Sequence, residues 1–195
     1  MRCSRSPFAE DLVRRRASLG LTGAMGQFDA AVLYALVTLT RPRVAVETGT
    51  HIGMSAAFVL QAMHDAGVAD GRLLSIDTRR TETTAVLVPD ALRDRLTLVT
   101  GDVAEVAESA TPDTIDLFLH DSTHRYSHQL WEFDTFWPRL RSGGVLASHD
   151  VDLNASFVDF VSRTYRHDAR GRADAPRRLH ATWGRLGLIG FAIKS

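Results

Sequence analysis

Five carboxylates stand at corresponding places in the chain, each at the end of a short apolar segment. They are Glu47, Asp77, Asp102, Asp121 and Asp150. If the apolar segments are parallel strands of one sheet, these acids gather at a single edge of it. Two unit charges about 4 Å apart repel by roughly 4 kcal/mol at an effective dielectric of 20. The pattern therefore predicts a ligand that relieves this repulsion, such as a cation or a molecule with hydroxyl and amino groups.

The loop after the first strand is the most specific of these places. Its sequence, E-T-G-T-H-I-G-M-S over residues 47–55, follows an apolar segment and opens a helical pattern. Glycines let the backbone approach a ligand closely, and the start of a helix offers unpaired N–H donors. Gly49 and Gly53 are spaced differently from the dinucleotide-binding pattern G-x-G-x-x-G. The acid before the first glycine would repel a pyrophosphate but suits an ammonium group, so we predict a ligand that carries one.

Alternating apolar patterns predict the strands and helices that must position these residues. Five strand–helix units and a closing pair of strands are typical of an α/β fold with a mostly parallel sheet. We therefore predict a Rossmann-like, doubly wound sheet of seven strands, the last one antiparallel, with helices on both faces. One domain is expected over 1–195, with an N-terminal helical cap over 1–26 and the core over 27–195. The predicted helices cover 8–19, 27–39, 55–64, 82–92, 103–109, 127–141 and 154–165, and the predicted strands cover 44–46, 73–76, 96–99, 115–119, 145–147, 179–183 and 187–193.

Composition narrows the class of protein. The chain has 23 basic and 23 acidic residues, a balance that argues against a dedicated nucleic-acid binder. The single cysteine, Cys3, excludes an internal disulfide framework and a zinc site built from cysteines. No apolar run approaches the ~20 residues that span a membrane, and the N-terminus lacks the apolar region of a signal peptide. We expect a cytoplasmic protein without nucleic-acid or membrane partners.

The first half of the chain resembles class I S-adenosylmethionine-dependent methyltransferases, and the likeness extends over roughly 22–193. It rests on E-x-G-x-x-x-G-x-S after the first strand, Asp77 at the end of the second, and Gly101-Asp102 after the third. The resemblance implies that Asp77 holds the ribose hydroxyls of the cofactor and that Asp102 meets the adenine amine. It also implies that the first loop carries the methionine portion through Glu47, Gly49, Gly53 and Ser55.

The second half is similar to small-molecule O-methyltransferases, nearest to the group that includes macrocin O-methyltransferase and more distantly to catechol O-methyltransferase. The residues concerned are Asp121 and His124 after the fourth strand, and His149 and Asp150 after the fifth. The resemblance implies that Asp121 and Asp150 bind a divalent cation such as Mg²⁺. His149 stands where an acid is usual, so it is either a ligand or a sign that no metal binds. His124 lies at the position of the base, which is Lys in the catechol enzymes.

Together these residues predict methyl transfer from S-adenosylmethionine to a hydroxyl of a small molecule, such as a secondary metabolite. Two carboxylates directed at one point raise each other's pKa unless a cation lies between them. A bound metal ion would lower the pKa of the acceptor hydroxyl, and His124 would take its proton. His124 and Asp121 are thus the predicted catalytic residues. Insertions that shape a large acceptor pocket are missing, so we expect a homo-oligomer whose partner subunit completes the pocket.

Other interpretations remain open at this point. A nicotinamide-dependent oxidoreductase shares the architecture, and a protein that binds S-adenosylmethionine without transferring its methyl group shares the binding loop. His124 is alternatively a helix-capping or core residue, and Asp150 is alternatively a helix cap. His120 is expected to be structural and His128 to be a surface or packing residue, while Trp131 is expected in the core.

Residues near the first loop complete the set of candidates. His51 lies within that loop and is a candidate for direct contact with the cofactor. Met25 and Gln27 precede the second predicted helix, in a segment that resembles the one that covers the cofactor in related O-methyltransferases.

Overall fold

The computed structural model describes residues 6–109, 113–168, 177–179 and 189–194. Its centre is one seven-stranded sheet with the order β3-β2-β1-β4-β5-β7-β6. The first five strands are parallel, and β7 runs antiparallel to both of its neighbours. This confirms the predicted fold class. The strands are β1 (Val44–Thr48), β2 (Arg72–Asp77), β3 (Leu96–Thr100), β4 (Ile115–His120), β5 (Leu140–Ser148), β6 (Arg177–Leu179) and β7 (Gly190–Ile193).

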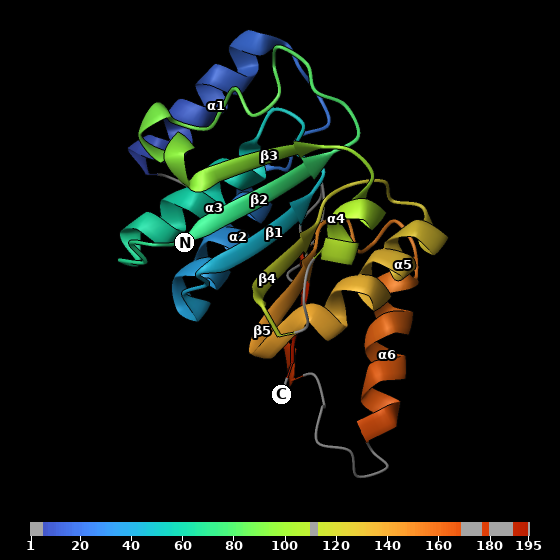
Figure 1. Ribbon diagram of the computed structural model, residues 1–195. Helices are drawn as coiled ribbons and strands as arrows, with labels where there is room; N and C mark the ends of the chain where they lie inside the picture. The colour runs from blue at the N-terminus through green and yellow to red at the C-terminus, as the bar shows by residue number, and fades with distance from the viewer. Residues whose placement is uncertain (1–5, 110–112, 169–176, 180–188, 195) are drawn as a thin grey trace.

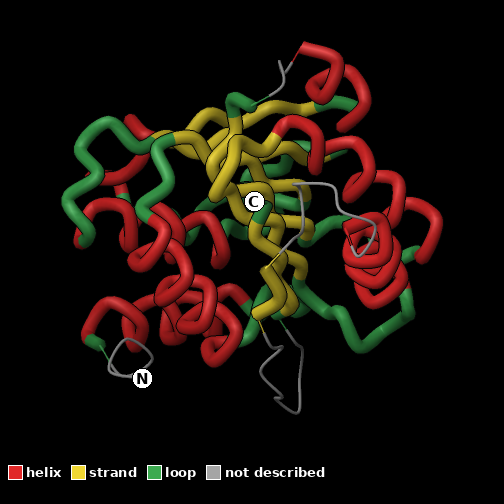
Figure 2. Tube along the Cα trace, turned by 90° about the horizontal axis from the view of Figure 1, so that it is seen from below, coloured by secondary structure: helices red, strands yellow, loops and turns green. Residues whose placement is uncertain are grey.

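Helices cover both faces of this sheet (Figure 1), and Figure 2 shows the strands between two layers of helices. Adjacent residues of a strand point to opposite faces, so Ala45 belongs to one core cluster and Val46 to the other. The first cluster joins the sheet to α1 (Pro7–Leu19), α2 (Gln27–Thr40) and α3 (Met54–Asp65). The second joins it to α4 (Val103–Ser109), α5 (Tyr126–Phe136) and α6 (Ser156–Asp168).

The register of the parallel strands aligns their carboxyl ends. Thr48 at the end of β1 pairs with His120 of β4, and His120 pairs with Ser148 of β5. The residues that follow continue the pairing, since the N–H of Asp121 donates to the carbonyl of Thr48 and that of His149 to the carbonyl of His120. The predicted acids and histidines therefore emerge side by side at one edge of the sheet.

The helix predicted over 82–92 is wrong. This segment forms turns, and a short 3-10 helix follows over Asp90–Arg95. Its backbone is bound elsewhere, because the N–H groups of Ala85 and Leu87 donate to the carbonyls of His51 and Ile52. Arg15 of α1 also donates to the carbonyl of Val86 at 2.6 Å. Tertiary hydrogen bonds to the first loop and to α1 thus replace the local bonds of a helix.

The predicted start of the fifth strand is also wrong, because β5 begins at Leu140 and not at Val145. Gly143 takes a φ of 77°, and the pairing of β4 with β5 shifts between Ile115 and Leu117. The glycines lie within an irregular strand and do not form the turn that the sequence indicates. The predicted closing hairpin falls partly on 180–188, outside the described residues, but β6 and β7 do pair antiparallel.

Two further observations concern the surface. Trp131 is 38% exposed, so the prediction that it belongs to the core is wrong. Its ring instead lies beside the imidazole of His128, with 5.6 Å between the ring centroids. None of the helices in the described part of the chain has the length and apolar character needed to cross a bilayer.

Candidate functional site

A cavity of about 630 Å³ opens at the carboxyl ends of the parallel strands. This is where ligands bind in doubly wound sheets. Six of the candidate residues from the sequence line it, whereas Met25, Gln27, Glu47, Gly53, Ser55, His149 and Asp150 do not. The lining consists of Gly23, Gly49, His51, Ile76, Asp77, Thr78, Gly101, Asp102, Val103, Asp121, Ser122, Thr123, His124 and His128.

The two glycines of the first loop have different structural roles. Gly49 has a φ of 91°, and a Cβ there would clash with the backbone carbonyl oxygen of Asp121. Gly53 has a φ of 80° at the N-cap of α3, where a Cβ would lie 2.8 Å from the Cα of Ala85. Any other residue would be strained at either position. Gly49 thus shapes the wall of the cavity, and Gly53 allows the packing behind it.

Glu47 lies behind this loop with its side chain fully buried. Its carboxyl group receives hydrogen bonds from the hydroxyls of Ser55 and Ser75, the latter at 2.6 Å. Ser75 in turn lies 2.7 Å from the hydroxyl of Thr50 in the loop. Burial raises the pKa of Glu47 to about 8 even though both serine hydroxyls act to lower it. Glu47 and Ser55 therefore fix the loop from behind, and a direct contact of either with a cofactor stays a prediction.

Asp77 and Asp102 line the cavity at the ends of neighbouring strands, as the sequence predicts. Asp77 accepts hydrogen bonds from the backbone N–H of His51 at 3.1 Å and of Arg79 at 3.2 Å. Asp102 accepts one from the N–H of Ala104 at 2.9 Å, at the start of α4. Each carboxylate is thus held by backbone donors and has lone pairs left for a ligand.

His124 lines the cavity and pairs with Asp150, which adopts a φ of 52°. Its Nε2 lies 3.2 Å from Asp150 Oδ2, while its Nδ1 is buried without a hydrogen-bond partner among the described residues. An N–H at Nε2 that points to the carboxylate leaves the lone pair on Nδ1. Burial lowers the pKa of His124, although Asp150 acts to raise it. His124 therefore has the neutral form that a general base needs.

His149 is directed at carboxylates and away from the cavity. Its Nδ1 lies 3.0 Å from Asp121 Oδ1 and 3.3 Å from Asp150 Oδ2. Its Nε2 makes no hydrogen bond among the described residues, and the nearest acidic oxygen there, Asp29 Oδ2, is 3.6 Å away. Burial by itself would lower the pKa of His149, but Asp121, Asp150 and Asp29 raise it to about 12. The three carboxylates thus favour the protonated form of His149.

The predicted divalent cation does not fit this arrangement. A histidine that binds metal is neutral and presents a lone pair to the ion, whereas His149 carries hydrogen toward its carboxylate partners. Among the described residues, no group of three or more His, Cys, Asp or Glu side chains is arranged to hold a metal ion. The predicted ligands Asp121 and Asp150 are bridged by a side chain of the protein itself.

Sequence reasoning missed the role of His128. This residue lines the cavity, and its Nε2 lies 2.8 Å from Glu132 Oε1. Glu132 is fully buried and is also bound by Thr48, His120 and Ser122 at 2.6–2.8 Å. The spacing of His128 and Glu132, four residues apart on a predicted helix, was the available signal. His120 is fully buried and hydrogen-bonded to Glu132, consistent with the expected structural role.

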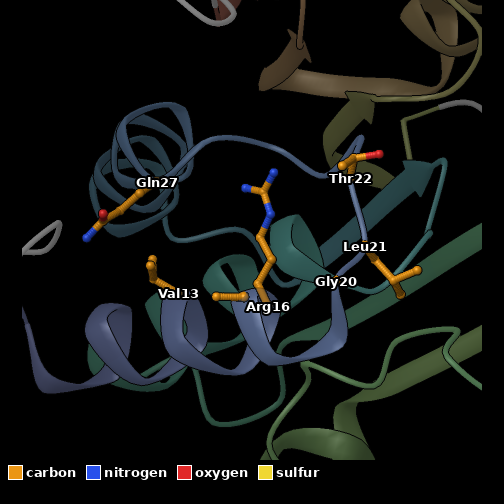
Figure 3. Close-up of a pocket in the computed structure, with 7 residues that line it drawn as sticks. Val13, Arg16, Gly20, Leu21, Thr22 and Gln27 are labelled. Carbon is orange, nitrogen blue, oxygen red and sulfur yellow. The ribbon is translucent and has the colours of Figure 1, made fainter.

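Asp29 and Gly23 were also missed, because both precede the first strand and stand far from the other site residues in sequence. Gly23 lines the cavity, whereas Met25 from the same segment is buried. Gln27 lines a second cavity of about 440 Å³ beside α1 (Figure 3). Among the described residues that line this second cavity, Arg16 is the one with a charged side chain, and it also donates to the carbonyl of Met25. The described part of this lining contains none of the carboxylates and histidines of the first cavity.

The comparisons with known proteins agree with this geometry. A family model described as a methyltransferase domain matches residues 46–151, more than half of the chain. The chain belongs to this family. The matched segment begins in β1 and ends just beyond Asp150, so it includes both the glycine loop and the His124–Asp150 pair. The protein is accordingly a methyltransferase, and no curated protein matches it significantly in sequence.

Solved structures match over nearly the whole chain. The O-methyltransferase TomG from Streptomyces achromogenes, involved in tomaymycin synthesis and solved with SAM, is 18% identical. The match covers 97% of this chain and 90% of that chain, with a TM-score of 0.73. An O-methyltransferase from Bacillus cereus, solved with SAH, is 20% identical and is matched over 97% and 91% of the two chains with a TM-score of 0.69. These likenesses show the fold, and the macrocin-like subgroup stays a prediction.

Proposed function

We propose that this methyltransferase uses S-adenosylmethionine to methylate a hydroxyl group of a small molecule. The observation that carries the proposal is the single cavity that brings together Gly49, Asp77, Asp102 and His124. Two carboxylates suit the hydroxyl and amino groups of a nucleoside, and a glycine backbone permits close approach. A neutral histidine at the same cavity suits a proton acceptor. O-methyltransferases among the structural neighbours support the same chemistry.

The residues of this chain would act as follows. Asp77 and Asp102 orient the nucleoside portion of the cofactor, and the Gly49 backbone leaves room for its methionine portion. S-adenosylmethionine, when bound, supplies an electrophilic methyl group on a sulfonium. His124 lines the cavity and accepts the proton of the acceptor hydroxyl, while Asp150 pairs with its Nε2 and orients the ring. Asp121 borders the cavity and pairs with His149. Much of the acceleration comes from holding both reactants in one orientation.

Binding of the cofactor product tests the first half of this proposal. We expect S-adenosylhomocysteine to bind the full chain in a calorimetric titration and NAD⁺ to give no heat. Replacing Asp77 with Ala should weaken binding roughly 10–100-fold, the worth of hydrogen bonds to a charged group. Asp90→Ala removes an exposed carboxylate outside the cavity and should leave affinity unchanged. Binding of NAD⁺ in place of S-adenosylhomocysteine would contradict the proposal.

Methyl transfer tests the second half. With an acceptor found in a panel of phenols, sugars and alcohols, His124→Ala should lower kcat by roughly 10²–10⁴-fold and preserve the affinity for S-adenosylhomocysteine. His64→Ala on the exposed side of α3 is the matched control. An equal loss of cofactor affinity would assign His124 a structural role. The predicted homo-oligomer is tested separately by light scattering at working concentration.

A further inference from the structure

Three carboxylates from separate elements surround the imidazole of His149. Asp29 comes from the first turn of α2, Asp121 follows β4, and Asp150 follows β5. Their oxygens lie between 3.0 and 3.6 Å from the two ring nitrogens. All four side chains are at most 22% exposed. Carboxylates gathered out of water in this way require a positive charge between them.

The ring itself occupies the centre of this group. Nδ1 faces Asp121 and Asp150, and Nε2 faces Asp29. Acidic oxygens face the ring from both sides, although Nε2 makes no hydrogen bond among the described residues, and they favour the protonated, positively charged imidazole. A protonated imidazole has no lone pair in its plane to offer a metal. An ion could bind these carboxylates only if the side chain of His149 left its place.

We propose that the side chain of His149 replaces the divalent cation that the likeness to catechol O-methyltransferase implies. We further infer that the acceptor is recognised through a single hydroxyl and not through a chelated pair of neighbouring hydroxyls. This second statement rests on the proposed function. A metal ion offers open coordination positions to two acceptor oxygens, whereas both ring nitrogens of His149 already face carboxylates.

His149 acts on the reaction through its neighbour and is therefore a positioning residue. The same oxygen of Asp150 lies 3.3 Å from His149 Nδ1 and 3.2 Å from His124 Nε2. His149 thereby fixes the carboxylate that sets which nitrogen of His124 carries hydrogen. It also ties α2 to the ends of β4 and β5 through Asp29 and Asp121.

Titration with Mn²⁺ alone tests the first statement without cofactor or acceptor. The full chain is stripped of metal, and free Mn²⁺ is followed by electron paramagnetic resonance. The wild type should not bind Mn²⁺ stoichiometrically in the micromolar range. His149→Asp removes the cation and adds a fourth carboxylate, so it should bind one Mn²⁺ roughly 10-fold or more tightly than the wild type. His64→Asp, on the exposed side of α3, should behave as the wild type.

Two results decide against the proposal. One is stoichiometric micromolar binding by the wild type that Asp121→Asn abolishes, which would make His149 a ligand. The other is a folded His149→Asp variant, verified by circular dichroism, that gains no affinity. If that variant does not fold, the wild-type titration alone decides whether a metal ion or His149 occupies the place between the carboxylates.

Acceptor preference tests the second statement. Turnover of the wild type should be the same before and after EDTA treatment. A phenol and the matching catechol should differ by less than about 3-fold in kcat/KM, since no chelation favours the second hydroxyl. Loss of turnover in EDTA with recovery in Mg²⁺ would overturn the proposal. Absence of methyl transfer to any acceptor would instead refute the proposed function and leave the Mn²⁺ result standing.

Discussion

Two glutamates, Glu47 and Glu132, lie on opposite sides of the end of β1, and both are fully buried. Glu47 is the penultimate residue of β1, and its carboxyl group is bound by the hydroxyls of Ser55 on α3 and Ser75 on β2. Burial raises the pKa of Glu47 to about 8. Burial therefore favours the protonated form of its carboxyl group.

The pKa of Glu132 on α5 is shifted in the opposite direction. Burial alone would raise the pKa of Glu132 as well, but hydrogen bonds from His120 and His128 lower it to about 2. The hydroxyls of Thr48 and Ser122 add to these bonds. Equal burial thus gives a neutral group on one side and an ionised group on the other, because imidazole donors stabilise the charge more than hydroxyl donors do.

The difference assigns the two glutamates different tasks. In its neutral form Glu47 anchors the glycine loop without placing a charge behind the cavity. Ionised Glu132 acts on the cavity through His128, because its hydrogen bond raises the pKa of that histidine. The neutral carboxyl group of Glu47 thus supports the loop after β1, and the charged carboxylate of Glu132 supports the loop after β4.

The largest expected effect is the loss of Glu132. Glu132→Gln should destabilise the protein by about 3 kcal/mol or more, because a buried charge that serves four donors is removed. Glu47→Gln is the matched variant and should cost far less, since it replaces one neutral group with another. Urea unfolding at pH 7 measures both. Equal losses would show that the two glutamates carry the same charge.

The dependence of stability on pH should be opposite for the two sites. The pKa of Glu47 lies at about 8, above its ordinary 4.5, so its contribution is complete below pH 4.5 and is lost as the pH rises through about 8. The pKa of Glu132 lies at about 2, so its contribution is present above pH 4.5 and is lost as the pH falls toward 2. Each group changes the unfolding free energy by up to about 1.4 kcal/mol per pH unit in its window.

Unfolding curves across this pH range check these signs. Glu47→Gln should flatten the loss of stability between pH 4.5 and about 8 and leave the curve below pH 4.5 unchanged. Glu132→Gln should do the reverse. If the Glu47→Gln curve runs parallel to that of the wild type from about pH 5 to about pH 9, the pKa of Glu47 is not raised in the folded protein, and its carboxyl group is not neutral.

The smallest effect is expected for Ser75→Ala. It removes one hydroxyl donor to Glu47 and the link to Thr50, at a cost of about 1 kcal/mol. The pKa of Glu47 should rise further, because Ser75 acts to lower it. Urea unfolding and the shift of the alkaline limb measure the two effects. A downward shift of that limb would mean that the serine favours the neutral carboxyl.

The sequence predicted those parts of the fold that depend on local periodicity. Short apolar runs bounded by polar residues identified β1 to β4, and the order of elements led to the sheet. The helix over 82–92 failed because Ala85 and Leu87 satisfy their backbone donors on the first loop, a contact that local propensity does not encode. The expectation for Trp131 failed because its ring lies beside the imidazole of His128 and stays 38% exposed instead of joining either core cluster.

In the candidate site, too, some features follow from the sequence and others depend on the tertiary structure. By itself, the sequence determined that acids end successive strands and that His124 follows Asp121, because parallel strands bring such residues to one edge. Only the tertiary structure decided which acids face the cavity and which charge each one carries. Asp29 meets His149, and Glu132 meets His120, through the packing of helices on the sheet, and the charge of a buried group depends on the donors that this packing supplies.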